Sequence, residues 1–213
     1  MRLTAAAITA LVLLTQAPAV HAQTQSPADA PATARLHARL SQAEVLRADF
    51  VQSKAMAAFK KPLVTRGQLV FAPRHGVIWK IEQPLRLTYV LREDRLIEIA
   101  ADGREQVKTA RELPAVAHVA RIFRALLGGQ TQSLDELFAA SLSGDPERDW
   151  TLTLTPRATQ TAQFVRRIAL AGGRHLDEIR LEEAGGDVTT LSFSHTRLAD
   201  ALSPEESRLL TTP

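Results

Sequence analysis

The sequence contains no cysteine at any of its 213 positions. This absence excludes disulfide bonds, thiolate nucleophiles, metal sites with cysteine ligands and the cysteine-linked lipid that anchors some exported proteins. The stability of the folded chain must therefore come from burial of an apolar core, which a chain of this length can form.

Recognisable catalytic motifs are missing as well. The chain has no Gly-x-Ser-x-Gly turn, no phosphate-binding glycine loop and no His-Glu-x-x-His pair. Asp177 and Glu178 are neighbours in a strand-like stretch, so their side chains point to opposite faces and cannot act together on one substrate. We therefore expect neither an enzyme nor a bound cofactor or metal. The histidines after residue 22 also lack the spacing of metal ligands: His37, His75, His118, His175 and His195.

Neither sign of charge dominates. The chain has 26 Lys and Arg residues against 23 Asp and Glu residues, for a formal net charge of +3. The two signs are interleaved in stretches such as "REDR" and "HLDEIRLEE". A nucleic-acid-binding surface usually carries clustered basic residues, so this composition predicts a solvated surface of mixed charge and no nucleic-acid partner.

Long hydrophobic runs are also lacking. The run from Ala5 to Leu14 is well short of the roughly 20 residues that span a bilayer. A basic residue precedes it, and a proline and small residues ending in "VHA" follow it, which is the pattern of a secretory signal peptide. We predict a cleaved signal peptide over residues 1–22, a flexible Pro- and Ala-rich leader over 23–34, and a single soluble, exported domain over 35–213.

What the sequence does contain is a series of short stretches in which apolar and polar residues alternate. Such alternation predicts strands with one buried face. After a helix predicted from Arg35, these stretches occupy "LRADFVQSK", residues 63–108 and residues 150–195. Two amphipathic helices are predicted between them, one over 114–127 and one over 133–142, the second opening with a Ser-x-x-Glu capping box. The pattern indicates an α+β fold, with about ten strands in one curved antiparallel sheet whose concave side is covered by helices.

The stretch "GVIWKIEQPLRLTYV", residues 76–90, raises the question of what the inner face of this sheet contacts. An antiparallel sheet of eight or more strands that curves on itself can enclose one small ligand. Pattern alone favours a filled core over a cavity, because most alternating strands face a core. The residues of the apolar face in and next to this stretch are Val77, Trp79, Ile81, Leu87, Tyr89 and Leu91.

The order of several short motifs resembles the LolA-like family of periplasmic outer-membrane lipoprotein carrier proteins. That family reads F-x-Q after the first helix, then a glycine-led strand, a turn, a strand that ends in Trp with a proline soon after, and much later W-x-L-x-L-x-P. The resemblance covers nearly the whole chain after the signal peptide. The matching residues here are Phe50 and Gln52, Gly67–Phe71, Trp79 with Pro84, and Trp150–Pro156.

The resemblance implies an incomplete, half-open antiparallel β-barrel of about ten or eleven strands with a helical lid over an apolar cavity. It implies a periplasmic carrier that binds acyl chains of a lipoprotein or other lipid and moves them from the inner to the outer membrane. The sequences "KPLVTRG" and "GVIWKIEQP" are more similar to a divergent branch of the family. Its inner-membrane partner would be the lipoprotein-releasing ABC transporter or an RND-type lipid exporter, and its second partner an outer-membrane acceptor.

The resemblance also implies the residues of a binding site. The helices over 114–127 and 133–142 would form the lid, and Arg74 would hold it closed, although the arginine of the family aligns one position earlier, at Pro73. The lipid-binding residues implied are Leu69, Phe71, Trp79, Ile81, Leu87, Tyr89, Leu91, Trp150 and Leu152 on the sheet, with Phe123 and Leu126 on the lid.

A second class of function stays open on the sequence. The same fold with a filled core would be a non-carrier interaction or sensor module of the periplasm that acts through its outer surface. The C-terminal stretch "LADALSPEESRLL", a helical or irregular tail, differs from the usual ending of the carriers, where partners dock.

Overall fold

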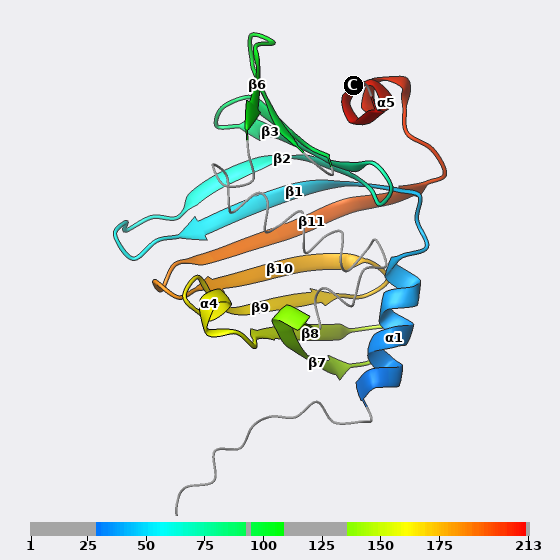
Figure 1. Cartoon of the computed structure of the whole chain (residues 1–213), viewed down its shortest axis with the longest axis vertical. Helices are drawn as coiled ribbons and strands as arrows, with labels where there is room; N and C mark the ends of the chain where they lie inside the picture. The colour runs from blue at the N-terminus through cyan, green and yellow to red at the C-terminus, as the bar shows by residue number, and fades with distance from the viewer. Residues whose placement is uncertain (1–28, 93–94, 109–135, 212–213) are drawn as a thin grey trace, which may run out of the picture.

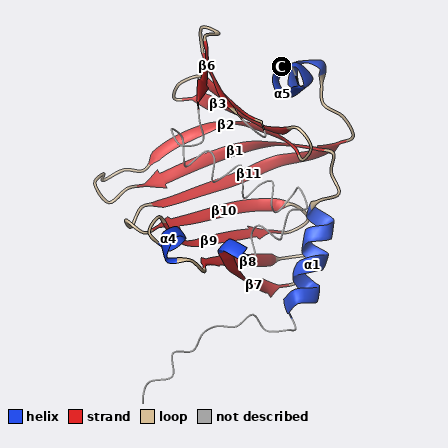
Figure 2. Cartoon of the chain, in the orientation of Figure 1, coloured by secondary structure: helices blue, strands red, loops and turns tan. Residues whose placement is uncertain are grey.

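A computed structural model describes residues 29–92, 95–108 and 136–211 of the chain (Figure 1). Strands predominate in these ranges (Figure 2), and no helix within them has the length and apolarity to cross a membrane. The elements in chain order are α1 (Asp29–Leu40), β1 (Val45–Ala55), β2 (Leu63–Ala72), β3 (Gly76–Gln83), β4 (Leu87–Leu91), β5 (Leu96–Ala100), β6 (Glu105–Lys108), β7 (Phe138–Gly144), β8 (Trp150–Pro156), α4 (Thr159–Ala162), β9 (Val165–Gly172), β10 (Leu176–Glu183), β11 (Val188–Ala199) and α5 (Pro204–Thr211).

The strands form one antiparallel sheet of eleven strands in the order β6-β5-β4-β3-β2-β1-β11-β10-β9-β8-β7. Nearly all neighbours in the sheet are consecutive in sequence. The exception is the central pair of β1 and β11, which pairs from Val45 opposite Ala199 to Ala55 opposite Val188, with a register shift between Arg47 and Asp49. Among the described residues no pairing joins the edge strands β6 and β7, so the sheet curves without closing (Figure 1). This confirms the predicted half-open antiparallel barrel.

Apolar side chains form two clusters, one on each face of the sheet. On β3, Val77 and Trp79 belong to one cluster and Ile78 between them belongs to the other, as the two-residue period of a strand requires. We call the face that also contacts Leu36 of α1 the inner face, and the face that contacts Leu210 of α5 the outer face.

Helix α1 covers the β7 end of the inner face (Figure 1). Leu36 is only 2% exposed and belongs to the inner cluster. Arg39 Nη2 and Trp150 Nε1 both donate hydrogen bonds to the carbonyl oxygen of Gly173, at 2.7 and 2.8 Å. This shared acceptor ties the helix to the turn between β9 and β10 and to the start of β8.

The start of α1 corrects the predicted leader. The helix begins at Asp29 and not near Arg35, so residues 29–34 are helical. Their Pro- and Ala-rich composition is that of a linker, but alanine has the highest helix propensity and Pro31 stands in the first turn, where its missing N–H costs nothing. Residues 23–28 and the predicted signal peptide lie outside the described residues.

The predicted helix over 133–142 is wrong for residues 138–142. This stretch belongs to β7, which pairs with β8 from Phe138 opposite Pro156 to Gly144 opposite Trp150. Phe138 and Leu142 are buried on the inner face, and a spacing of four satisfies a strand as well as a helix. The partner strand therefore decides the structure, a tertiary effect that overrides the local helix signal. The helix predicted over 114–127 lies outside the described residues.

The C-terminal tail forms α5 on the outer face. Its start is a capping box, in which the Ser203 N–H donates to Glu206 Oε2 at 2.6 Å and the Glu206 N–H donates to Ser203 Oγ at 3.2 Å. Arg47 of β1 donates to the same carboxylate through Nε at 2.7 Å and also through Nη2. At the other end of the helix, Arg92 Nη2 donates to the Leu209 carbonyl at 2.7 Å. These contacts press Leu210 against the outer cluster.

Gly67 lies where the backbones of β2 and β3 approach closely. It stands between Phe50 of β1 and Ile81 of β3, and a Cβ at this position would lie 1.8 Å from the Lys80 carbonyl oxygen. Because Gly67 has no side chain, the ring of Phe50 reaches across β2 to the indole of Trp79, with a centroid separation of 4.4 Å and an interplanar angle of 38°. The close approach of the β2 and β3 backbones therefore requires glycine.

Gly67→Ala should destabilise the protein by about 3 kcal/mol or more, because the added methyl group collides with backbone that cannot move without breaking the β2–β3 ladder. Urea unfolding followed by circular dichroism measures this loss. Gly185→Ala is the matched control, since a Cβ there has no atom within 4 Å, and it should change the free energy of unfolding by less than about 0.5 kcal/mol. Equal effects of the two substitutions would contradict the close approach at Gly67.

Glu206→Gln should lower stability mainly at neutral pH. The hydrogen bond from Arg47 holds the pKa of Glu206 below its ordinary value, so the stabilisation is present above that ordinary value and is lost as the pH falls. We expect a loss of about 1 kcal/mol near pH 7 that shrinks as the pH falls below the ordinary carboxyl value, measured by urea unfolding. Glutamine preserves the capping box, and Glu205→Gln, at an exposed position in the same turn, controls for the loss of one charge. A loss that persists undiminished at low pH would show that the charge pair is not its cause.

Candidate functional site

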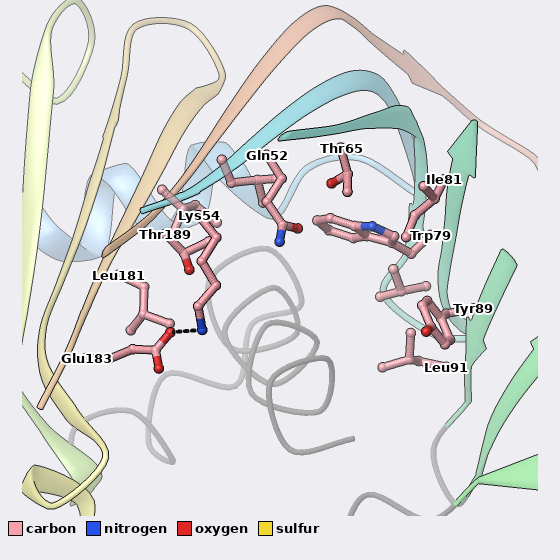
Figure 3. A pocket seen from close by; sticks show the side chains of 13 residues that line it. Gln52, Lys54, Thr65, Trp79, Ile81, Tyr89, Leu91, Leu181, Glu183 and Thr189 are labelled. Atoms are coloured by element: carbon pink, nitrogen blue, oxygen red, sulfur yellow. Dashed lines mark hydrogen bonds and ion pairs between the residues drawn. The ribbon is translucent and has the colours of Figure 1, made fainter. Parts of the chain in front are cut away.

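An apolar pocket of about 230 Å³ lies on the inner face (Figure 3). A buried water requires about 10–15 Å³ on the same measure, so the pocket holds on the order of fifteen groups of that size, and a methylene group is comparable. This is room for about one acyl chain. The lining residues are Gln52, Lys54, Thr65, Val77, Trp79, Ile81, Tyr89, Leu91, Ile179, Leu181, Glu183, Thr189 and Leu191.

Strands β3 and β4 provide the first wall of the pocket. Trp79 stands opposite Tyr89, and Val77 stands opposite Leu91, so their side chains form adjacent rows on the inner face. Trp79 is 7% exposed, with its indole packed against Phe50. Burial raises the pKa of Tyr89, and the nearby carboxylate of Glu98 raises it further. The phenol therefore stays uncharged at neutral pH.

Strands β10 and β11 provide the second wall. Ile179 stands opposite Leu191, and Leu181 stands opposite Thr189. In the sheet order these strands are separated from β3 and β4 by β2 and β1, which form the floor. Figure 3 shows Leu181 on one side of the pocket and Trp79, Tyr89 and Leu91 on the other. Curvature of the sheet thus brings together side chains from strands that are far apart in sequence.

An ion-pair cluster closes one end of the pocket. Lys54 Nζ lies 2.8 Å from Glu183 Oε1 and 3.5 Å from Asp187 Oδ2. The hydrogen bond to Glu183 is the main cause that raises the pKa of Lys54, so the ammonium stays charged. The three side chains are each about 30% exposed, which places the pair at the rim of the pocket and not deep inside it.

The inner face is filled at its α1 and β7 end. Leu154, Ile168 and Leu170 are fully buried there, next to Leu36 of α1. The inner face therefore has two parts, a packed core at the α1 and β7 end and a pocket between the two walls. Core and cavity, the alternatives that the sequence left open, are both present.

The predicted lipid-binding residues divide between these two parts. Trp79, Ile81, Tyr89 and Leu91 line the pocket. Leu69, Phe71, Trp150 and Leu152 are nearly fully buried in the packed core, and Leu87 is partly buried beside Ile81 without reaching the pocket lining. Phe123 and Leu126 lie outside the described residues.

Arg74 lies in the turn between β2 and β3, with its side chain 77% exposed. Its guanidinium lies 3.4 Å from Glu44, which is itself half exposed. Ion pairs of this kind between exposed side chains contribute little to stability. Of the two lid segments that Arg74 was predicted to hold, 114–127 lies outside the described residues and residues 138–142 form a strand, so the latch remains a prediction.

Sequence reasoning missed the second wall and the floor of the pocket. Alternation in "HLDEIRLEE" and "VTTLSFSH" did place Ile179, Leu181 and Leu191 on the apolar faces of their strands. No local signal shows that these strands face Trp79 across the sheet, because that depends on the pairing of β1 with β11. The two-residue period places the polar residues Gln52 and Lys54 on the same face as Phe50, and Thr65 on the face of Leu69, but it does not show that they line a pocket.

Several solved structures are similar to this chain. The LolA superfamily protein NE2245 from Nitrosomonas europaea is 12% identical, with a TM-score of 0.47, over 85% of this chain and 98% of that one. A DUF1329 family protein from Desulfovibrio piger is 12% identical, with a TM-score of 0.47, over 87% of this chain and 97% of that one. The lipoprotein LppX from Mycobacterium tuberculosis is 10% identical, with a TM-score of 0.43, over 84% of this chain and 100% of that one. No curated protein matches the chain in sequence.

The sequence was also compared with models of protein families. Residues 25–204 match the model described as "Outer membrane lipoprotein carrier protein LolA-like". The match extends from before α1 to the start of α5 and so includes all eleven strands and both walls of the pocket. The chain, with its open antiparallel sheet, belongs to the LolA-like family.

Proposed function

We propose that this protein is a periplasmic carrier that binds acyl chains of a lipoprotein or another lipid in the pocket and moves them from the inner to the outer membrane. The observation that carries the proposal is the unfilled space between two facing apolar walls on an otherwise well-packed sheet. Membership in the LolA-like family supports it. The family is one of binding proteins, and the proposed function requires no catalysis.

Hydrophobic burial supplies the binding energy in this proposal. Each buried methylene group contributes about 0.8 kcal/mol relative to water, so ten of them contribute on the order of 8 kcal/mol before the cost of ordering the chain. A chain in a bilayer is already in an apolar medium, so transfer between membrane and pocket is nearly balanced. The pocket shields the chain from water in between, and uptake and release need only a small bias at each membrane.

The proposal includes a donor and an acceptor. An inner-membrane transporter, either the lipoprotein-releasing ABC type or an RND-type lipid exporter, would load the pocket, and an outer-membrane acceptor would empty it. The N-terminal segment supports a periplasmic location, because residues 1–22 have the composition of a secretory signal peptide.

The two tryptophans of the chain provide a direct test of acyl-chain binding. Trp79 lines the pocket, whereas Trp150 is 2% exposed in the packed core. A fatty acyl chain that carries bromine atoms quenches an indole that it touches. We expect such a chain to quench the emission of Trp150→Phe, which retains Trp79, in a saturable way. Trp79→Phe, which retains Trp150, should be quenched weakly or not at all.

The outcome of this titration decides between a carrier and a filled module. Absence of quenching in both variants, with near-ultraviolet circular dichroism showing that they are folded, would contradict the proposed function. Equal quenching of both indoles would place the chain somewhere other than the pocket. Lipid that remains bound to protein purified from the periplasm, seen by native mass spectrometry, would identify the class of cargo.

Leu181→Asp should weaken acyl-chain binding by about tenfold or more, because it places a carboxylate in the second wall, where the chain would remove its hydration. Leu181 is only partly buried, so the variant should still fold. Ser141→Asp adds the same charge at an exposed position of β7 and should bind like the unmodified protein. Unchanged binding by Leu181→Asp would exclude the second wall from the site.

A further inference from the structure

The pocket has a polar end as well as apolar walls. Gln52 stands opposite Thr65 across β1 and β2, and Lys54 stands opposite Thr189 across β1 and β11. With Glu183, the last residue of β10, these side chains form a band across four neighbouring strands (Figure 3). Val77 and Leu91, which stand opposite each other on β3 and β4, line the pocket at the end away from these polar side chains. A ligand that matches this arrangement has a polar head and an apolar chain.

Three of the polar groups lack hydrogen-bond partners. The hydroxyl oxygen of Thr65 is buried and has no partner within the described residues. In the same part of the chain the side chains of Gln52 and Thr189, both only partly buried, form no hydrogen bond. A buried polar group without a partner costs about 1–3 kcal/mol, which applies to the Thr65 hydroxyl. The partly exposed side chains of Gln52 and Thr189 can form hydrogen bonds with water or with a bound ligand.

The charges at this end are already paired. Lys54 is held between Glu183 and Asp187, so the carboxylates outnumber the ammonium, and the carboxylate of Glu98 acts on Tyr89 of the first wall. An anionic head group would meet this excess of negative charge and would have to break the existing ion pair. A cationic head group would have to share these carboxylates with Lys54, whose like charge repels it. Only an uncharged head group leaves the cluster intact.

We propose that the pocket selects lipids whose head group is uncharged and forms hydrogen bonds, such as the ester and hydroxyl groups of an acylglycerol, over lipids that carry a phosphate or an amine at that position. The proposal rests on the proposed acyl-carrier function and specifies its ligand. The head group contacts Gln52 and Thr189 at the rim and approaches the Thr65 hydroxyl behind them, while the chain lies between the two walls.

Three ligands with the same chain length test this selectivity: mono-oleoylglycerol, mono-oleoylglycerol phosphate and oleylamine. Each competes with the brominated chain for Trp79 in the Trp150→Phe protein. We expect mono-oleoylglycerol to bind about tenfold or more tightly than either charged ligand. Octadecene, which has no head group, reports binding of the chain alone.

Substitutions in the polar end separate head-group recognition from packing. Thr65→Val preserves the shape of the side chain and should weaken the binding of mono-oleoylglycerol about three- to tenfold without affecting the binding of octadecene. The ligand-free variant should unfold at an equal or higher temperature, because a buried unpaired hydroxyl is removed. Glu183→Gln should reduce severalfold the ratio of the affinity for mono-oleoylglycerol to the affinity for its phosphate. Thr190→Val, whose strand partners are Ser53 and Arg180 and which lies on the opposite face from Thr189, should change none of these affinities.

The possible failures are distinguishable. If octadecene and all three lipids fail to compete, the pocket does not bind chains, and the proposed function falls together with the selectivity. If all four ligands bind alike, or Thr65→Val weakens octadecene as much as mono-oleoylglycerol, the pocket binds chains but the head-group proposal is wrong. Tighter binding of the phosphate or the amine also overturns it.

Discussion

The contact between Phe50 and Trp79 across Gly67 is the constraint on which the pocket depends. Two strands separated by a third are about 10 Å apart, yet the two rings meet at 4.4 Å between centroids, which is possible only because the strand between them has no side chain at that point. One side of Trp79 therefore belongs to the packed core and the other to the pocket. The indole marks the boundary between the filled and the hollow part of the inner face.

The same sheet is full at one end and hollow between its walls for identifiable reasons. At the α1 end, Leu36 and Phe138 bring large apolar side chains onto the inner face. On the floor of the pocket the inward positions are held by Gln52, Lys54 and Thr65, which are polar and do not pack as a core does. Curvature holds the walls apart, and no residue in the described part of the chain fills the gap.

Support for the first wall comes from the outer face. Helix α5 places Leu210 against a cluster that includes Ile78 and Val90, the outward neighbours of Trp79 and Tyr89. Arg47 and Arg92 fix the two ends of this helix. A wall that is packed from behind keeps its shape when the pocket is empty, so less of the binding energy is needed to order it.

The sequence by itself indicated the alternation of the strands and one curved antiparallel sheet, because a period of two residues assigns each side chain to a face, and it implied the half-open barrel and one wall of the pocket only through the family resemblance. The order of the short motifs along the sequence carries that resemblance. Only the tertiary structure decided that residues 138–142 form a strand and not a helix, because pairing with β8 across the following turn and burial on the inner face override the local helix signal. Likewise, Trp150 and Trp79 have the same pattern in sequence and both belong to the inner core cluster, but only Trp79 also lines the pocket. The pairing of β1 with β11 and the curvature of the sheet set that difference, and both depend on residues more than a hundred positions apart.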